Sequence, residues 1–333
     1  MAINQGKVGQ AKSEVVRELP LACSNETAAV EFWEKHRWGD KPCCPHCGGH
    51  HVYQMKDAKT GERNKRFLWR CRECKKQFTV KVGTVLEDSR IPLTIWSYAL
   101  WRSCTSKKGV SALEIQRQTG ISYKSALFLM HRLRFAMAPT DGGPKLSGIV
   151  EADETYVGGK PRNRVPHSPI PRKPGQLSNH QLMHVRKTPV FAVVERGGQA
   201  RARVMPSVTR DNLSAALREH VEMSARLMTD EHRGYQKIGR EFEGGHDCIE
   251  HKRGIYARGD VTTNTVEGFF SILKRGINGI YHNVSRKHLQ RYVDEFEFRY
   301  NHRKLEDGER TIAAIRGAVG KKLYYREPIA AAG

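Results

Sequence analysis

Three acidic residues in widely separated segments have the types and settings needed to bind divalent metal ions. Asp153 lies in an alternating run over residues 149–157, and Asp230 closes a second apolar run. Glu267 lies in a helical pattern over residues 264–275. Carboxylate oxygens are the ligands that Mg²⁺ prefers, and two such ions about 3.5–4 Å apart activate a water or hydroxyl and stabilise a leaving oxygen. The three acids therefore predict metal-dependent chemistry on a phosphodiester, with two Mg²⁺ or Mn²⁺ ions.

The helix around Glu267 has two distinct faces. At about 100° per residue, Glu267 and Lys274 fall within roughly 60° of one another. This face is expected to line the active site, where Glu267 ligates metal and Lys274 contacts a phosphate near it. Three apolar residues on the opposite side are expected in the core: Phe269, Ile272 and Leu273.

Neighbouring acids are alternative ligands. Glu151 and Glu154 share a strand with Asp153, and Glu231 follows Asp230. Because side chains alternate along a strand, Glu151 faces the same way as Asp153 and Glu154 faces the opposite way. A single aspartate at a strand end is more often a turn former or a helix cap. The prediction therefore depends on the three acids together.

The chain is strongly basic, which favours a polyanionic partner. Its 333 residues include 57 Lys and Arg against 35 Asp and Glu, a formal net charge of +22. Residues 158–188 contain seven Lys or Arg, five prolines and no acid. This basic insertion is either a linker loop or a loop that orders on DNA through phosphate contacts, with Lys160 and Arg162 among them. A charge excess of this size indicates nucleic acid.

The sequence contains no membrane-spanning pattern. The mean hydropathy is −0.61, and there is no run of about 18 apolar residues. The first residues lack the apolar region of a signal peptide. We therefore expect a cytoplasmic, nucleoid-associated protein with no membrane partner.

Eight cysteines are present, and four of them form two CxxC pairs separated by 23 residues. Each pair forms a turn with two thiolates directed at one point, and two pairs supply the tetrahedral set that suits Zn²⁺. Four thiolates leave no open coordination position, so the zinc is expected to be structural. Short strands are expected near residues 52–55, 66–70 and 77–80. The expected ligands are Cys44, Cys47, Cys71 and Cys74, with Cys43 as an alternative to Cys44.

Residues 109–137 have the pattern of a helix-turn-helix. The first helix is expected to end at Thr119, Gly120 supplies the turn, and Ser122 caps the second helix. The second helix has an apolar face, and basic residues on its other sides are expected to face a major groove. An ordinary pair of helices with a solvated basic face is the alternative. The expected DNA contacts here are Lys124, His131 and Arg134, and Arg275 is expected to contact DNA from the Glu267 helix.

The remaining segments predict an α/β catalytic domain with a mixed sheet flanked by helices. Residues 188–205 have the pattern of a β-hairpin, Asp211–Arg226 that of a helix, and a strand ends at Asp230. A ribonuclease-H-like core has the order three strands, a helix, a strand and a helix. Its acids lie on the first strand, the fourth strand and the following helix, as they do in this pattern. The zinc ribbon and helix-turn-helix precede this domain.

The expected organisation begins with a helix over residues 25–38 that Asn25 caps. The predicted boundaries are a helical segment over residues 1–40, a zinc ribbon over 41–90, a helix-turn-helix region over 91–138, a linker over 139–145, the catalytic domain over 146–317 with the basic insertion at 158–188, and a tail over 318–333.

Several motifs together resemble the DDE transposases of bacterial insertion sequences, in the zinc-ribbon group related to Merlin transposons. The resemblance covers roughly residues 25–317, and its motifs are Cys44-Pro-His-Cys47, Glu151-Ala-Asp-Glu-Thr-Tyr-Val-Gly-Gly-Lys160, Thr229-Asp-Glu-His-Arg-Gly-Tyr235, His251, Asn264-Thr-Val-Glu-Gly-Phe-Phe-Ser-Ile-Leu-Lys-Arg275 and Arg286-Lys-His-Leu-Gln-Arg-Tyr-Val-Asp-Glu-Phe-Glu-Phe-Arg-Tyr-Asn-His-Arg303.

The resemblance implies a transposase that acts on terminal inverted repeats and target DNA. Its metal ligands would be Asp153, Asp230 and Glu267, with Lys274 as the associated basic residue. Bringing two ends together implies a homodimer or a larger assembly. Two other readings stay open: a catalytically silent DNA-binding regulator derived from such an enzyme, and a repair or recombination nuclease of the same fold.

Overall fold

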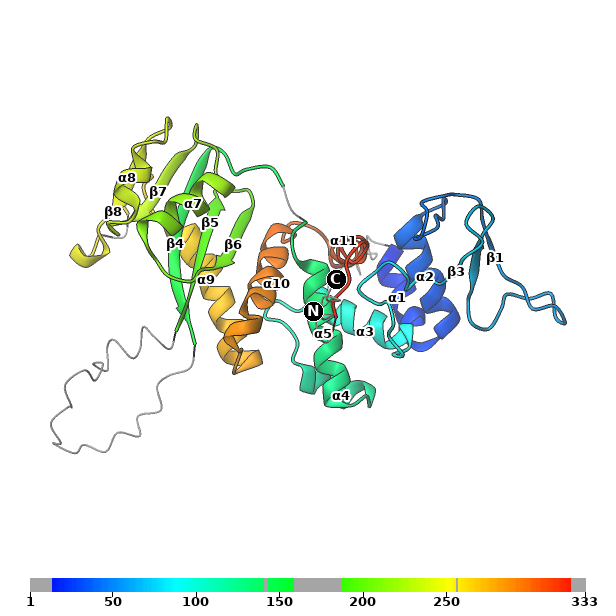
Figure 1. Cartoon of the computed structure of the whole chain (residues 1–333). Coiled ribbons are helices and arrows are strands. Elements are labelled where there is room, and N and C mark those ends of the chain that lie inside the picture. The colour runs from blue at the N-terminus through cyan, green and yellow to red at the C-terminus, as the bar shows by residue number, and fades with distance from the viewer. Residues whose placement is uncertain (1–13, 141–142, 159–186, 256, 325–333) are drawn as a thin grey trace, which may run out of the picture. The chain divides into compact units, whose positions relative to one another are not determined.

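The computed structural model describes residues 14–140, 143–158, 187–255 and 257–324, which form two compact units (Figure 1). The first unit extends to Ala138 and resumes at His302, and the second spans Pro139–Asn301. The predicted end of the catalytic domain at residue 317 is therefore wrong. Helix α11 (Asp307–Gly317) packs against helices of the first unit, where Ala314 and Ile315 are buried.

The first unit contains a group of helices that pack against one another. The predicted cap of α2 is confirmed, because the Ala28 N–H donates to Asn25 Oδ1 at 3.0 Å. Packing between α1 and α3, and between α11 and α3, brings the two ends of the described chain together in one unit. Its helices are α1 (Glu14–Ser24), α2 (Glu26–Trp38), α3 (Leu93–Thr105), α4 (Ala112–Thr119), α5 (Tyr123–Met137) and α11.

The turn and the helix cap that the sequence predicts within residues 109–137 are present between α4 and α5. Gly120 has a φ of 74°, in the left-handed region, and Ser122 accepts the Ser125 N–H at 3.2 Å. The assignment of DNA-facing residues is wrong for His131 and Arg134, which are only 7% and 2% exposed. The reason is that α5 packs against α3, α4 and α11, so His131 and Arg134 are enclosed along with its apolar residues.

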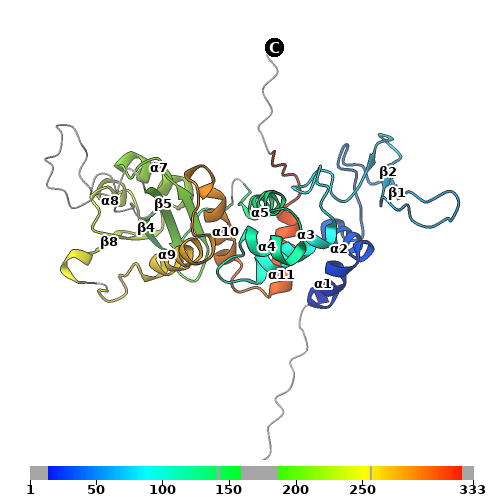
Figure 2. The same cartoon turned by 90° about the horizontal axis from the view of Figure 1, so that it is seen from below.

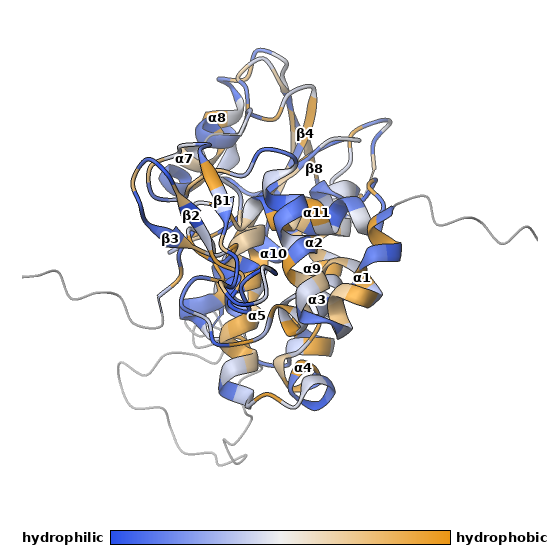
Figure 3. Ribbon diagram, turned by 90° about the vertical axis from the view of Figure 1, so that its right-hand side faces the viewer, coloured by the Kyte–Doolittle hydropathy of each residue, from blue (hydrophilic) through white to orange (hydrophobic). Residues whose placement is uncertain are grey.

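A three-stranded sheet carries the cysteine segment. Its strands β1 (Val52–Gln54), β2 (Trp69–Cys71) and β3 (Gln77–Phe78) pair antiparallel in that order. The segment is largely hydrophilic (Figure 3), and its small core includes Trp69 and Phe78. A core of this size buries little apolar area, so a bound metal must supply much of the folding free energy.

The second unit is built on a mixed sheet in the order β6-β5-β4-β7-β8. β5 runs antiparallel to β4 and β6, whereas β7 runs parallel to β4 and β8. This confirms the predicted α/β domain and its hairpin. The strands are β4 (Ile149–Val157), β5 (Thr188–Glu195), β6 (Ala200–Val204), β7 (Arg226–Asp230) and β8 (His246–Ile249).

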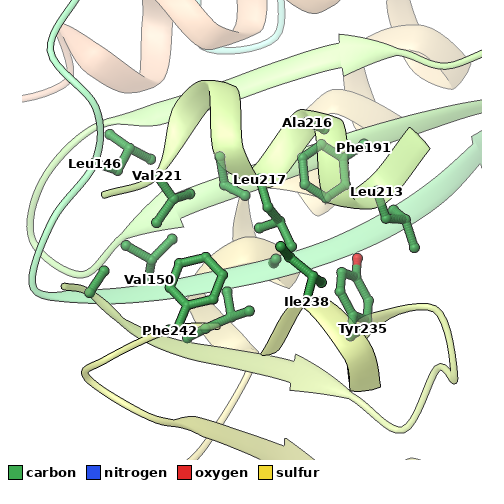
Figure 4. Close-up of a cluster of buried hydrophobic side chains, with 14 of the residues drawn as sticks. Leu146, Val150, Phe191, Leu213, Ala216, Leu217, Val221, Tyr235, Ile238 and Phe242 are labelled. Atoms are coloured by element: carbon green, nitrogen blue, oxygen red, sulfur yellow. The ribbon is translucent and has the colours of Figure 1, made fainter. Parts of the chain in front are cut away.

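Helices cover both faces of this sheet (Figure 2). On one face, Val150 and Ala152 pack against α7 (Arg210–His220) and α8 (Tyr235–Gly239), as Figure 4 shows for Val150. On the other face, β4 and β5 pack against α9 (Asn264–Gly276) and α10 (Leu289–Asn301). The alternation predicted along β4 is therefore confirmed, with Asp153 on the α9 side.

Three local predictions in this unit are wrong. Helix α7 ends at His220, six residues early, because Val221 is extended and bridges Leu146. Strand β8 was not predicted, because its first three residues are polar or half-buried. Ile272 is 42% exposed and lies beside the buried stripe of α9. That stripe is formed by Val266, Phe269, Phe270 and Leu273.

Side chains of helix α10 accept hydrogen bonds from the backbone N–H groups along the open edge of β6. Asn301 accepts the Ala200 N–H at 2.7 Å, and Glu297 accepts the Ala202 N–H at 2.8 Å. Gln290 accepts the Val204 N–H at 2.7 Å. An exposed strand edge would otherwise pair with other chains, so α10 closes this side of the sheet.

Replacing Glu297 with Gln is expected to stabilise the protein at pH 8. Burial raises the pKa of Glu297 from 4.5 to about 7. A carboxyl with a raised pKa contributes stability at acidic pH, and this contribution is lost as the pH rises from about 4.5 to about 7. Gln keeps the acceptor for Ala202, so we expect a gain of about 1–3 kcal/mol in unfolding free energy at pH 8 and almost none at pH 4.5.

Thermal unfolding at the two pH values measures this difference. Glu222→Gln, at an exposed position in the same unit, is the matched control. A gain in Glu297→Gln that is equal at both pH values would show that charge burial is not its cause.

Candidate active site and zinc site

The two predicted aspartates lie side by side on neighbouring strands. β4 and β7 pair in parallel, with Glu151 opposite Met228. This pairing ends there, and Asp153 and Asp230 each lie two residues further along their strands. Asp153 accepts the Glu154 N–H at 2.7 Å, and Asp230 accepts the His232 N–H at 2.9 Å. The two aspartates therefore lie on adjacent strands, just beyond the paired residues.

Glu267 enters the site from the first turn of α9. Its Oε1 accepts the Thr263 hydroxyl at 3.0 Å, and the same hydroxyl lies 3.2 Å from His251 Nε2. His251 Nε2 is 3.7 Å from Glu267 Oε1. The His251 N–H in turn donates to Glu231 at 2.8 Å. Glu231, the weaker rival acid, thus holds the histidine that orients Glu267.

Burial and nearby charges shift the pKa of Asp153. Burial raises its pKa from 3.8 to about 7, and the charges of Asp230 and Glu267 also raise it. The Glu154 N–H and His251 lower it. Carboxylates that disfavour one another's charge are typical of sites that bind cations.

Glu151 has a structural role that its sequence neighbours do not share. It is completely buried and accepts the N–H groups of Thr265 and Val266 at 2.7 and 3.1 Å. These groups are at the start of α9, where a carboxylate also meets the positive end of the helix dipole. Arg196 Nε donates to the same carboxylate at 2.6 Å and Arg196 Nη2 to Thr262 O at 3.1 Å. Glu151 therefore fixes α9, and with it Glu267, to the strand of Asp153.

Replacing Glu151 with Ala is expected to lower the unfolding free energy by about 3–5 kcal/mol, because it leaves Arg196 and two amide groups without their acceptor. Urea denaturation measures the loss. Glu243→Ala, at an exposed position in the same unit, is the control. A loss no larger than that of the control would contradict the anchoring role.

Glu154 points to the opposite face of the sheet and cannot join the three acids. Its carboxylate accepts the hydroxyl of Tyr235, which is completely buried. Burial raises the pKa of Glu154 to about 8. Glu151 and Glu154, the two alternative ligands on β4, therefore both have hydrogen-bond partners within the protein.

The structure describes some of the residues that are predicted to contact phosphate, and others lie outside the described ranges. Lys274 and Arg275 in the last turn of α9 are exposed, and so is Lys124 in α5. Lys160 and Arg162 lie outside the described residues, as does most of the basic insertion. Lys274 is seven residues after Glu267, on the same side of the helix.

The four predicted zinc ligands converge in the first unit. Their sulfur atoms all lie within 4.8 Å of one another, with Cys44 Sγ to Cys74 Sγ at 3.6 Å and Cys47 Sγ to Cys71 Sγ at 3.7 Å. Zn–S bonds of about 2.3 Å in a tetrahedron place sulfurs about 3.8 Å apart, so these thiols fit Zn²⁺. Cys43 is not in the cluster, which resolves the alternative in favour of Cys44.

The turn after each cysteine pair has the same unusual backbone. Gly48 and Lys75 directly follow the second cysteine of their pairs, with φ values of 76° and 61°. Gly48 N–H donates to Cys44 O at 2.9 Å, which closes the first turn. The two turns present their thiols in matching ways, as a four-cysteine ribbon requires.

No helix in the described ranges is long and apolar enough to cross a membrane.

Comparison with known proteins gives two family matches. A model described as an ISXO2-like transposase domain matches residues 145–301. A model described as a transposase zinc-ribbon domain matches residues 24–77.

One relative is described as an uncharacterized protein in transposable element ISH50 of Halobacterium salinarum. It is 26% identical over 277 residues, which covers 83% of this chain and 90% of the relative. A simian T-cell lymphotropic virus intasome structure in complex with PP2A regulatory subunit B56 gamma aligns at 13% identity over 57% of this chain and 69% of that chain. Its TM-score of 0.28 is too low to support an argument.

Proposed function

Because the chain belongs to the ISXO2-like transposases of insertion sequences, we propose that Asp153, Asp230 and Glu267 form the metal centre that cleaves and joins DNA. The observation that carries the proposal is that β4 and β7 are adjacent strands and that α9 packs on the sheet face that Asp153 occupies. These elements are distant in sequence, and packing on both faces of the sheet fixes them relative to one another. Their shared effect on the pKa of Asp153 supports the same grouping.

The chain's own residues position the reacting groups. Carboxylate oxygens suit hard divalent cations. Two Mg²⁺ or Mn²⁺ ions, when bound, supply an activated water or 3′-hydroxyl and stabilise the leaving oxygen. Asp153 and Asp230 are held by the sheet, and Glu267 is oriented by Thr263 and His251. Rigid placement of this kind lowers the entropic part of the barrier.

We assign the second unit to the ribonuclease-H-like folds. The support is the sheet order β6-β5-β4-β7-β8 with the first three strands antiparallel and the last three parallel. The acids then lie on the first strand, the fourth strand and the helix α9, as the sequence order predicts.

We also propose DNA contacts outside the metal centre. The zinc ribbon and the α4–α5 pair recognise element ends, with Lys124 exposed at the start of α5. Lys274 and Arg275 contact the backbone near the scissile phosphate, with Lys160 and Arg162 as further contacts. Two ends must react together, so the active species is a homodimer or larger assembly on DNA.

Cleavage of a labelled duplex that carries the element's terminal repeat tests this function. Wild-type protein is expected to cut at the repeat boundary only with Mg²⁺ or Mn²⁺. Glu267→Gln is expected to bind the duplex and not cut it, whereas Glu243→Gln, an exposed control, cuts as the wild type does. Binding without cutting by the wild type would favour the silent regulator, and cutting without joining, on any sequence, would favour a nuclease.

A further inference from the structure

The end of the α9–α10 hairpin carries a positive surface that extends beyond the residues already assigned to the metal centre. From Gly268 to Val293 the chain has five Lys or Arg, two His and no Asp or Glu. The turn between α9 and α10 brings the end of one helix and the start of the next together (Figure 1). We define the hairpin-end surface by four exposed residues at this turn: Lys274, Arg275, Arg286 and Lys287.

Within the ranges that the structure describes, none of these four cations forms an ion pair. Other exposed or half-exposed arginines of the same unit do, such as Arg218 with Glu241 at 2.6 Å and Arg226 with Asp247 at 2.8 Å. Clustered charge without internal partners attracts a polyanion.

The turn that presents them is held rigidly. It contains a π-helical segment, η2 (Ile277–Tyr281), followed by His282 with a φ of 56°. Tyr281 donates its hydroxyl to both oxygens of Glu295 at 2.8 and 2.9 Å and packs edge-on against Tyr292 at 4.7 Å. Ile277 is buried in the core beneath α9 and α10. A non-glycine residue at positive φ is strained, and such strain and π-helical turns concentrate at functional sites.

The surface begins close to the metal centre. Lys274 lies seven residues after Glu267, about 10 Å along the helix. One strand of a duplex advances about 3.4 Å per nucleotide along the duplex axis, so a duplex parallel to α9 covers this separation in about three nucleotides. On such a path, a strand held at the acids would reach Lys274 after about three nucleotides.

We propose that the hairpin-end surface binds the phosphate backbone of DNA beside the scissile position, with Arg286 and Lys287 as contacts additional to those already assigned. The inference rests on the proposed function, because it takes DNA to be the substrate of the three acids. Contacts of this kind fix the position of the duplex and are independent of base sequence.

The double variant Arg286→Gln/Lys287→Gln tests the surface in the full chain. The matched control is Lys237→Gln/Arg240→Gln, which removes the same charge from exposed residues around α8, on the opposite face of the sheet. Affinity is measured in EDTA over a salt series, on the terminal-repeat duplex and on an unrelated duplex. Loss of two phosphate contacts is expected to reduce the slope of log affinity against log salt by about 2 on both duplexes. The control is expected to leave the slope unchanged, and equal slopes in the two double variants would overturn the proposal.

Acetylation of wild-type protein gives a second readout that no folding defect can affect. Mass spectrometry is expected to find Lys287 protected by DNA and Lys237 equally reactive with and without DNA. If the slope falls and Lys287 is protected but the wild type never cuts the repeat in Mg²⁺, the surface stands and the proposed function fails. If the wild type cuts but neither slope nor protection changes, the surface is wrong and the function stands.

Discussion

Asp153→Asn is expected to lower metal-dependent DNA cleavage by roughly 10⁴-fold, the scale at which loss of one member of a catalytic unit acts. Asn retains the shape and the acceptor for the Glu154 N–H. It lacks the negative charge that a divalent cation requires. Binding to the terminal-repeat duplex is expected to stay at the wild-type level, since no described contact of Asp153 shapes the basic surfaces. Single-turnover cleavage rates and filter binding measure the two effects.

The same variant is expected to be more stable than the wild type without metal. Asp153 has a pKa raised from 3.8 to about 7. Its contribution to stability is therefore present below about pH 3.8 and lost as the pH rises to about 7. At pH 8 we expect Asn to raise the unfolding free energy by on the order of 2 kcal/mol. Asp211→Asn, exposed at the start of α7, is the control for both effects. Residual metal-dependent cutting by a clean Asp153→Asn preparation would remove this residue from the metal centre.

Cys71→Ser is expected to abolish stoichiometric zinc binding and unfold the ribbon. Cys71 is completely buried, and its sulfur lies 3.7 Å from that of Cys47. Structural zinc sites in small domains supply on the order of 10 kcal/mol of folding free energy, which the core around Trp69 and Phe78 cannot replace. Metal analysis measures zinc per chain, and hydrogen exchange in β1 and β2 measures the loss of order. Binding to the terminal repeat is expected to weaken as well.

Cys43→Ser is the matched control for the zinc site. Cys43 adjoins Cys44 and is half-buried, yet it lies outside the four-cysteine cluster. It is expected to keep one zinc per chain. Zinc retained in Cys71→Ser, or lost in Cys43→Ser, would mean that the ligand set is assigned incorrectly.

Features that depend on near neighbours in the chain were predictable from the sequence. The caps at Asn25 and Ser122, the turn at Gly120 and the two cysteine pairs each need only a few adjacent residues. The alternation along β4 also predicted which face Asp153 occupies, because side-chain direction in a strand has a strict period of two.

Features that depend on tertiary packing were not predictable in the same way. His131 and Arg134 looked solvent-facing on a helical wheel, but a wheel does not reveal that α3, α4 and α11 all pack on α5. The packing of α11 against the first unit likewise could not be predicted from the order of residues along the chain. The sequence makes Glu151 an alternative ligand, whereas its contacts with Thr265 and Arg196 make it the anchor of α9.

His251 illustrates an intermediate case. The motif resemblance marked this histidine without giving it a role. Its position within 3.7 Å of Glu267, through a shared contact with Thr263, depends on the turn that joins β8 to α9. The resemblance was the signal in the sequence, and it did not identify a partner.

Metal-directed cleavage of the protein backbone tests the three-acid centre most directly. Fe²⁺ replaces Mg²⁺ in the full chain bound to the terminal-repeat duplex, and ascorbate with peroxide generates radicals that cut the backbone beside the bound ion. Mass spectrometry is expected to find cuts near Asp153, Asp230 and Glu267, all suppressed by excess Mg²⁺ and absent in Asp153→Asn. Cuts that avoid these three segments, or that persist in excess Mg²⁺, would contradict the account.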